Sequence, residues 1–228
     1  MIKLINKLYF NKIISRLFHT SIYCLKKELK DCENVLDLGC GPRSPIKHIP
    51  VQYSVGVELF EPYLKESMNR MIHNRYIHAD VRKIEFEPKS FDSVILIGVL
   101  EHLTKEEGYK LIHKMDEIAR KKIVISTPNG FLAQKEVNHN ILQTHKSGWT
   151  VDELRDLGYK AKGMAGWKFS RRKNICKELG TELDVIYSTI KFKPRFLWLI
   201  ISELTQLITY YFPKISFEIF YVKNLNGD

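Results

Sequence analysis

Three carboxylates follow short apolar segments of the chain at places where they can hold one ligand. Asp37 lies within VLDLG, Glu58 ends YSVGVE and Asp80 ends YIHAD. Each segment has the β-branched and apolar composition of a buried strand. Because the carboxyl ends of parallel strands meet at one edge of a sheet, we expect the three acids to lie near one another. Taken singly, each acid is more typical of a solvated loop.

The stretch VLDLGCGPRS ends a predicted strand on a turn of Gly39, Cys40 and Gly41. Glycines allow a sharp turn and let a ligand approach main-chain N–H groups that a Cβ would cover. The simpler interpretation is a tight turn without a ligand. However, Glu58 can accept hydrogen bonds from both ribose hydroxyls of a nucleoside. Asp80 can accept one from an adenine amino group. The set therefore favours an adenosine.

Dinucleotide-binding proteins share part of this pattern. Their fingerprint needs a third glycine, so that a helix N-terminus can hold the pyrophosphate, and Ser44 occupies that position here. Asp37 would place a negative charge beside a pyrophosphate, whereas it pairs well with the ammonium group of an amino acid. Adenosine joined to an amino-acid cation describes S-adenosylmethionine. This cofactor is predicted, and a nicotinamide cofactor is the distant alternative.

The order of elements predicts an α/β domain. Short apolar runs alternate with helix-like stretches, which is typical of a parallel sheet covered by helices. Capping boxes mark two helix starts, at Thr104 with Glu107 and at Thr150 with Glu153. After the first capping box, apolar residues recur at helical spacing as far as Ala119. The expected strands cover residues 35–39, 53–58, 76–80, 91–98, 123–126, 159–163 and 216–223.

These segments resemble the class I S-adenosylmethionine-dependent methyltransferases over about residues 34–163. The likeness is carried, in family order, by DLGCGP, GVELFEPYL, ADVRKIEF, FDSVILIGVLEHL, VISTPNG and HKSGW. The chain is similar in particular to a group of small methyltransferases whose substrate class we do not name. The resemblance implies a Rossmann-like seven-stranded sheet, mostly parallel with an antiparallel last strand, and helices on both faces.

The resemblance also assigns residues to the cofactor. They are Asp37, Gly39, Cys40, Gly41, Glu58, Leu59, Asp80, Val81 and Gly98. In the family pattern, the glycine turn and its acid hold the methionine part, and the acid after the second strand holds the ribose. Leu59 packs on the adenine face, and the residues after the third strand hold the adenine edge. Gly98, whose backbone would contact the methionine ammonium, stands where the family often has an Asp, so a side-chain contact from that position is absent.

Two histidines are the candidate catalytic residues. Methyl transfer from a sulfonium is an in-line displacement, so positioning of the acceptor can supply most of the acceleration and a base is optional. Histidine can take a proton from a hydroxyl near neutral pH. For His102, just before a helix, a packing role is the favoured alternative. For His145, in the loop after the fifth strand, catalysis or contact with the acceptor is favoured as much as a packing role is.

The net charge of +10 is concentrated in two segments. Residues 1–30 carry +6 and residues 157–177 carry +7, which leaves −3 for the rest of the chain. Residues 1–33 are expected to form a basic amphipathic helical segment ahead of a methyltransferase domain over residues 34–228. That segment either lies on an anionic membrane or folds over the cofactor pocket. The second segment either attracts an anionic acceptor or is a solvated basic loop.

Composition and apolar patterning favour a cytoplasmic protein. Hydrophobic residues at 44% and charged residues at 27% are typical of a globular chain. No uninterrupted apolar run approaches the roughly 18 residues of a membrane span, and no secretory signal is evident. The apolar helix expected at 194–213 should pack on the sheet, with contact between its aromatic face and lipid as the alternative. Reduced, buried thiols and no metal site are expected, because zinc-like spacing is lacking among Cys24, Cys32, Cys40 and Cys176.

The predicted function is methyl transfer to a small or lipid-linked, anionic acceptor, with peripheral contact to an anionic membrane as one expected partner. Methylation of RNA or protein is the enzymatic alternative. Nucleic acid is disfavoured because the sequence has no recognised RNA-binding module. A cofactor-binding regulatory subunit without turnover is the non-enzymatic alternative.

Overall fold

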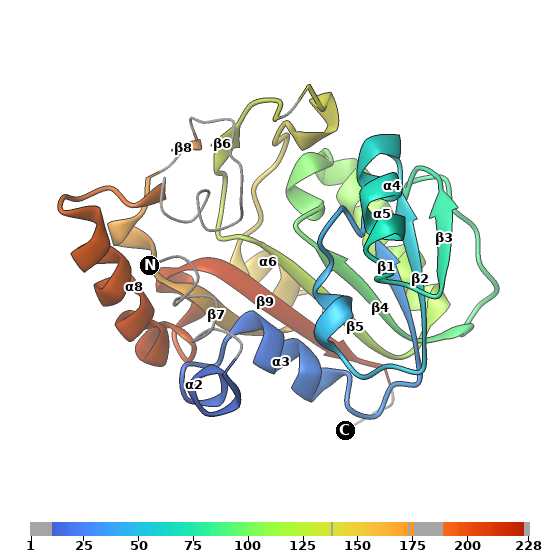
Figure 1. Ribbon diagram of the computed structural model, residues 1–228, viewed down its shortest axis with the longest axis horizontal. Coiled ribbons are helices and arrows are strands. Elements are labelled where there is room, and N and C mark those ends of the chain that lie inside the picture. The colour runs from blue at the N-terminus through green and yellow to red at the C-terminus, as the bar shows by residue number, and fades with distance from the viewer. Residues whose placement is uncertain (1–10, 138, 173, 176–188, 226–228) are drawn as a thin grey trace.

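Seven strands form one twisted, mostly parallel sheet in a computed structural model of the chain (Figure 1). The structure describes residues 11–137, 139–172, 174–175 and 189–225. The sheet order is β3-β2-β1-β4-β5-β9-β7. The strands are β1 (Asn34–Leu38), β2 (Tyr53–Glu58), β3 (Arg75–His78), β4 (Phe91–Ile97), β5 (Ala119–Pro128), β7 (Lys160–Trp167) and β9 (Ser216–Asn224). All seven predicted strands are present.

The last strand is inserted antiparallel, as predicted. β9 pairs antiparallel with both β5 and β7, whereas β1 to β5 pair in parallel. Central strands are buried on both faces. In β4, for example, Val94 and Leu96 enter one apolar cluster and Ile95 enters the other. Alternation of side chains along a strand explains this division. The result is a Rossmann-like arrangement with helices on both faces of the sheet.

The helices are α2 (Lys12–Leu17), α3 (Ser21–Glu28), α4 (Glu61–Asn69), α5 (Lys105–Ile118), α6 (Val151–Arg155) and α8 (Arg195–Thr209). Short 3-10 turns are η1 (Pro45–His48), η2 (Leu100–His102), η3 (Ile141–Gln143), η4 (Lys168–Ser170) and η5 (Pro213–Ile215). A two-stranded sheet that the sequence did not predict pairs β6 (Ala133–Gln134) with β8 (Asn174–Ile175).

Both predicted capping boxes form. The Thr104 side chain accepts from the Glu107 N–H at the start of α5, and Thr150 accepts from Glu153 at the start of α6. Helix α5 ends at Ile118, one residue before the last of the apolar positions that recur at helical spacing. Ala119 has extended backbone, with ψ of 139°, and it begins β5. Its apolar side chain is buried either way, so hydrophobic spacing alone does not mark where the helix ends.

The N-terminal basic segment is broken into two short helices where the structure describes it. His19 lies between α2 and α3 with φ of 49°, and Thr20 then caps α3. Cys24 and Leu25 of α3 are buried in the apolar cluster that also contains Phe220 of β9. The segment therefore packs on the sheet over this stretch. Residues 2–10 of the predicted amphipathic stripe lie outside the described residues.

Helix α8 packs on β7 through its polar side. An added Cβ at Gly163 would lie 2.0 Å from the Thr209 carbonyl oxygen, and one at Gly166 would lie 2.0 Å from that of Ser202. These contacts bury Ser202, Gln206 and Thr209, while apolar residues of the helix face outward. The prediction that this helix packs on the sheet is confirmed. Over the described residues, no helix combines the length and the apolar character needed to cross a membrane.

Three cysteines are free thiols in the described part of the chain. Cys24, Cys32 and Cys40 are buried, as expected, and burial raises the pKa of each thiol. Cys176 lies outside the described residues.

Candidate active site

The glycine turn after β1 has the left-handed backbone that glycine favours. Gly39 has φ of 71° and Gly41 has φ of 55°. A Cβ at Gly39 would lie 2.5 Å from Val99 Cγ2, whereas a Cβ at Gly41 would meet no atom within 4 Å. Gly39 is therefore required by close packing, and Gly41 borders open space in which a ligand can approach.

The N–H groups of this turn are used differently from our expectation. Gly39 and Cys40 both donate to the Val57 carbonyl, over 2.8 and 3.0 Å. Gly41 donates to Glu58 Oε2 over 3.0 Å. These bonds fix the turn against β2. The three N–H groups of the turn are therefore already bonded within the protein, and a ligand can approach the turn only from its open side.

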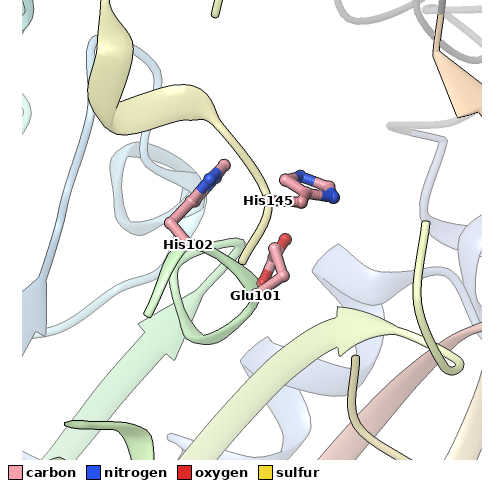
Figure 2. Close-up of side chains that lie close together, drawn as sticks. All are labelled: Glu101, His102 and His145. Atoms are coloured by element: carbon pink, nitrogen blue, oxygen red, sulfur yellow. The ribbon is translucent and has the colours of Figure 1, made fainter. Parts of the chain in front are cut away.

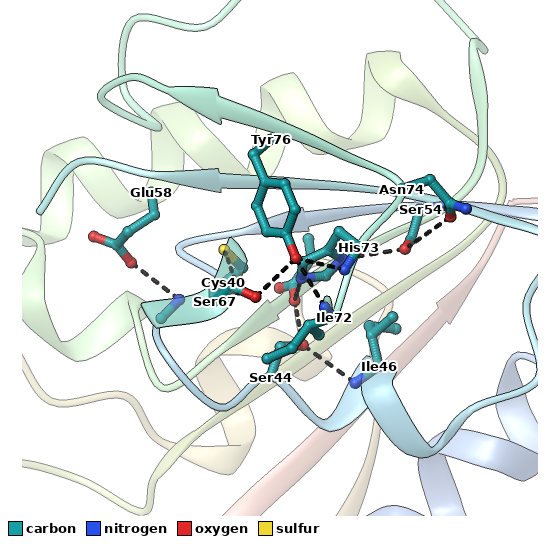
Figure 3. Close-up of polar contacts among 12 residues, drawn as sticks. Cys40, Ser44, Ile46, Ser54, Glu58, Ser67, Ile72, His73, Asn74 and Tyr76 are labelled. Atoms are coloured by element: carbon teal, nitrogen blue, oxygen red, sulfur yellow. Dashed lines mark hydrogen bonds and ion pairs between the residues drawn. The ribbon is translucent and has the colours of Figure 1, made fainter. Parts of the chain in front are cut away.

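Glu58 is held at the end of β2 by two backbone N–H groups. Its second oxygen accepts from the Phe60 N–H over 2.7 Å. Burial raises the pKa of Glu58, and the bonds from Phe60 and Gly41 oppose that rise. Figure 3 shows the carboxylate pointing at the turn after β1. Glu58 is thus a buried, pre-oriented acceptor at the sheet edge where we expected the ribose.

Asp37 is a buried carboxyl beside the same turn, and its side chain is 2% exposed. Burial is the main reason that its pKa rises to about 7, and the nearby Glu58 adds to the rise. Ser44 Oγ donates to Asp37 Oδ2 over 2.5 Å, and this hydrogen bond opposes the rise in the pKa of Asp37. His73 Nε2 lies 3.4 Å from the same oxygen, but burial lowers the pKa of His73 to about 4, which leaves it neutral. A bound ammonium group would supply the missing positive charge.

Asp80 already has a cationic partner. Arg82 Nη2 donates to Asp80 Oδ2 over 2.5 Å, and Arg82 also donates to Glu107 over 2.6 Å. The bond from Arg82 lowers the pKa of Asp80, against a smaller effect of burial. Close by, Leu59 is partly exposed and Val81 is buried. Asp80, Leu59 and Val81 all lie at the predicted edge of the sheet. However, the Asp80 carboxylate already accepts from Arg82, whereas we expected it to accept only from adenine.

Cys40 turns its side chain away from the open side of the turn. Its Sγ lies 4.0 Å from Ser67 Oγ, and a Cβ added to Gly56 of β2 would approach that sulfur to 2.9 Å (Figure 3). The Cys40 side chain therefore packs inside the protein, and its backbone N–H is already used by the Val57 carbonyl. Gly98, at the end of β4, has φ of 65° and donates to the Ser126 carbonyl.

The two candidate histidines lie together, and a third residue joins them. The His102 and His145 ring centroids are 4.7 Å apart. Glu101 groups with both rings (Figure 2), such that one ligand atom from each residue lies within 4.8 Å of the others. Burial lowers the pKa of both histidines and raises that of Glu101.

Backbone contacts bring this cluster together. Lys146 and Ser147 N–H both donate to the Glu101 carbonyl, over 2.8 and 3.1 Å. Trp149 Nε1, fully buried, donates to Ser147 Oγ over 2.9 Å. The loop that carries His145 is thus fastened to η2, which carries Glu101. A Cβ at Gly98 would lie 3.8 Å from Glu101 Oε1, so the cluster borders the end of β4.

Glu101 was missed in our reading of the sequence, which considered only histidines at these positions. The available signal was its place beside His102 just after a buried strand. An acid there is also typical of a helix start, so the sequence alone does not separate the two roles.

A cavity of about 430 Å³ lies next to the cluster. Leu132 links the two, because it lines the cavity and its carbonyl accepts from His145 Nδ1 over 2.5 Å. The lining consists of Pro128, Asn129, Phe131, Leu132, Lys168, Phe169, Arg171, Arg172, Lys191 and Phe217. It combines aromatic rings with basic side chains and contains no acid.

A family model described as a methyltransferase domain matches residues 36–124. That match covers the strands that carry the glycine turn, Glu58, Asp80 and the Glu101–His102 pair. Over these residues the chain therefore contains a methyltransferase domain, and its seven-stranded sheet has the fold of the class I S-adenosylmethionine-dependent methyltransferases, the class in which this cofactor is the methyl donor.

An uncharacterised protein of Methanocaldococcus jannaschii is 27% identical over 194 residues, which are 84% of this chain and 65% of that protein. A probable (S)-tetrahydroprotoberberine N-methyltransferase of Papaver bracteatum is 31% identical over 91 residues, which are 36% of this chain and 25% of that enzyme. The chain thus spans about two thirds of the length of the archaeal protein and about a quarter of the length of the plant enzyme.

A solved structure of an S-adenosylmethionine-dependent methyltransferase from Archaeoglobus fulgidus has the same fold. The TM-score is 0.52 at 18% identity, over 93% of this chain and 98% of the other.

Proposed function

We propose that the chain transfers a methyl group from S-adenosylmethionine to a small or lipid-linked anionic acceptor. The observation that carries the proposal is the position of the Glu101–His102–His145 cluster. One side of it borders Gly98, at the edge predicted to hold the methionine part of the cofactor. The other side joins the basic cavity through Leu132. An acceptor in the cavity would present its reacting atom at the cluster.

The chain's own residues fit the cofactor in three respects. Asp37 lacks a charged cationic partner among the described residues and would pair with the methionine ammonium. Glu58 is oriented to accept from ribose hydroxyls. Gly41 leaves room for close approach. The cofactor supplies an electrophilic methyl group and a sulfur leaving group.

In the proposed reaction, an acceptor oxygen or nitrogen forms a bond to the methyl carbon while the bond from that carbon to sulfur breaks. Sulfur keeps the electron pair, and a protonated acceptor passes its proton to the His145 imidazole, or to water if no base is used. Holding the acceptor in line supplies most of the acceleration. His145 contacts the acceptor in this proposal, and His102 supports it across the ring contact.

An anionic acceptor is supported by the charges around the cavity. Arg171 is buried and is committed to the protein, since it donates to Thr189 and Ser202. Lys168 donates to the Asn129 carbonyl. Arg172 and Lys191 also line the cavity, where Lys191 lies 5.4 Å from the Phe169 ring centroid. Cations over an apolar, aromatic floor suit a ligand with a negative group and an apolar body.

The exposed face of α8 supports contact with an anionic membrane. Its outward residues are Phe196, Leu197, Ile200, Leu204, Leu207 and Ile208. Lys191 and Lys193 precede the helix. An apolar helix face beside basic residues binds at the surface of anionic bilayers. A lipid-linked acceptor would then enter the cavity from the membrane, because Phe169 of the cavity wall contacts Phe192, and Phe192 contacts Trp198 of α8.

Vesicle flotation tests the membrane contact. We expect binding to vesicles that contain anionic lipid, with weaker binding to neutral vesicles and at high salt. Leu204→Glu, on the outward face, should abolish flotation, whereas Met71→Glu, a more exposed apolar position next to α4, should not. Equal flotation of the two variants would contradict the proposal, and retention on RNA with no vesicle binding would favour an RNA substrate.

Methyl transfer is tested with radiolabelled S-adenosylmethionine and a fractionated extract. Label in lipid or small anionic molecules would support the proposal. Label in RNA or protein would show that the acceptor is RNA or protein and would contradict the proposed acceptor class. Calorimetric binding of the cofactor without labelled product would favour a regulatory subunit, and a rise in Tm with a nicotinamide cofactor instead would replace the cofactor.

A further inference from the structure

We infer that Glu101, His102 and His145 bind one divalent transition-metal cation beside the acceptor cavity. The three residues come from η2 and from the loop after η3, and they lie together only in the folded chain (Figure 2). The binding inference stands on this geometry alone. Only the role of the ion in catalysis rests on the proposed methyl transfer.

The two imidazoles are oriented as metal ligands are. His145 Nδ1 lies 2.5 Å from the Leu132 carbonyl oxygen, and His102 Nδ1 lies 3.3 Å from that of Thr144. A carbonyl oxygen only accepts, so the neutral tautomer that these contacts favour carries its proton on Nδ1 and has its lone pair on Nε2. Ligating histidines commonly donate their other N–H to a backbone carbonyl in this way, which fixes the ring.

Glu101 supplies a negative charge that the surrounding protein does not balance. Glu101 is 6% exposed, and Thr127 Oγ1 donates to Glu101 Oε2 over 3.0 Å. Over the described residues, neither Lys nor Arg forms an ion pair with this carboxylate. Burial of an unpaired carboxylate is unfavourable, and a divalent cation between it and two imidazole lone pairs would offset that cost. The Thr127 bond is the outer contact that commonly orients a ligating carboxylate.

The donor set indicates the class of ion. Two nitrogens and one carboxylate oxygen suit zinc, iron, cobalt, nickel or manganese better than calcium or magnesium, which prefer oxygen ligands. Bonds of about 2.0–2.2 Å require the ligand atoms to approach more closely than 4.8 Å, so binding draws the side chains together. Three protein ligands leave further positions open. An acceptor oxygen from the cavity would take one of them and be held beside Gly98, facing the predicted methyl donor.

Cation binding can be measured without any enzyme assay. Untagged protein, stripped with a chelator, is titrated with Co²⁺ followed by visible absorption and with Mn²⁺ followed by paramagnetic resonance. We expect one ion per chain. His145→Ala should weaken binding by at least about 10–100-fold. His113→Ala, an exposed histidine on α5, is the matched control and should leave binding unchanged. A melting curve and calorimetry with S-adenosylhomocysteine verify that each variant is folded; His102→Ala replaces His145→Ala if the latter fails.

Absence of stoichiometric binding in the wild-type protein, or equal binding by His145→Ala and wild type, would overturn the inference. The result separates it from the proposed function. Methyl transfer that continues in chelator with no bound ion would leave the function standing and remove the metal. One bound ion lost in His145→Ala would uphold the site even where no acceptor is methylated.

Discussion

The backbone N–H of Gly41 donates to Glu58 Oε2 over 3.0 Å, which joins the turn after β1 to the acid at the end of β2. The two parts of the predicted cofactor site are therefore connected before any ligand binds. A pre-oriented site loses less freedom on binding. Substitutions at the turn, at Glu58 and at Asp37 should accordingly have separable effects on folding and on cofactor affinity.

Alanine at Gly39 and at Gly41 should behave differently. Both positions need left-handed backbone, which costs an L-residue about 1–2 kcal/mol. At Gly39 the new Cβ also meets Val99, so Gly39→Ala should lower both Tm and affinity for S-adenosylhomocysteine. Gly41→Ala meets no atom and should cost less stability, yet its methyl group enters the space proposed for the cofactor. Calorimetry and melting curves test this; wild-type affinity in Gly41→Ala would contradict the placement.

Glu58→Gln should weaken binding of S-adenosylhomocysteine without unfolding the chain. The amide oxygen can keep one backbone N–H bond, but the charge that receives ribose hydroxyls is lost. Hydrogen bonds to charged groups contribute about 1.5–3 kcal/mol, which corresponds to roughly 10–150-fold in affinity. Glu66→Gln, an exposed acid on α4 paired with Arg70, is the control and should bind normally. Equal affinities of the two variants would show that Glu58 does not contact the ligand.

Asp37 should make the free protein less stable as pH rises from about 4 to 7. The unfolded chain loses this proton near the ordinary pKa of 3.8, whereas the folded chain keeps it up to about 7. Between those values the folded state binds more protons, so its stability falls with rising pH. Asp37→Asn should remove this loss, on the order of 1–4 kcal/mol, and gain in Tm relative to wild type from pH 5 to 8.

The control for this titration is Asp31→Asn. Asp31 is an exposed acid whose pKa is lowered, mainly by a bond from Lys122, so it does not destabilise the folded state as pH rises. A Tm difference between Asp37→Asn and wild type that stays constant across this pH range would refute the assignment. Asp37→Asn should also bind S-adenosylmethionine poorly at every pH, because the carboxylate proposed to pair with the methionine ammonium is absent.

Gly166→Ala should detach α8 from β7. The added Cβ would lie 2.0 Å from the Ser202 carbonyl, and φ at Gly166 is 69°. Overpacking and strain together should cost about 2–5 kcal/mol. Gly158→Ala is the matched control, since it shares the left-handed backbone but its nearest contact would be Lys223 Cε at 3.6 Å. Urea unfolding followed by circular dichroism should show a clearly larger loss for Gly166→Ala; equal losses would mean that packing under α8 is loose.

Local chemistry in the sequence was sufficient to predict most of the sheet and to place Asp37, Glu58 and the glycine turn at its carboxyl edge. Strand composition, the two capping boxes and the glycines of the turn act over a few residues, so they can be read in order along the chain. The same holds for Asp37 and Glu58, because each lies within the last two residues of its own strand.

Tertiary structure decided what depends on contacts between distant segments. The meeting of Glu101 with His145 requires the loop after β5 to fold back onto η2, and no spacing in the sequence encodes that contact. The pairing of Asp80 with Arg82 depends on rotamers. The outward apolar face of α8 follows from Gly163 and Gly166, because their missing side chains let its polar face approach β7. Hydrophobic pattern alone predicts the opposite orientation, since burial usually selects the apolar face.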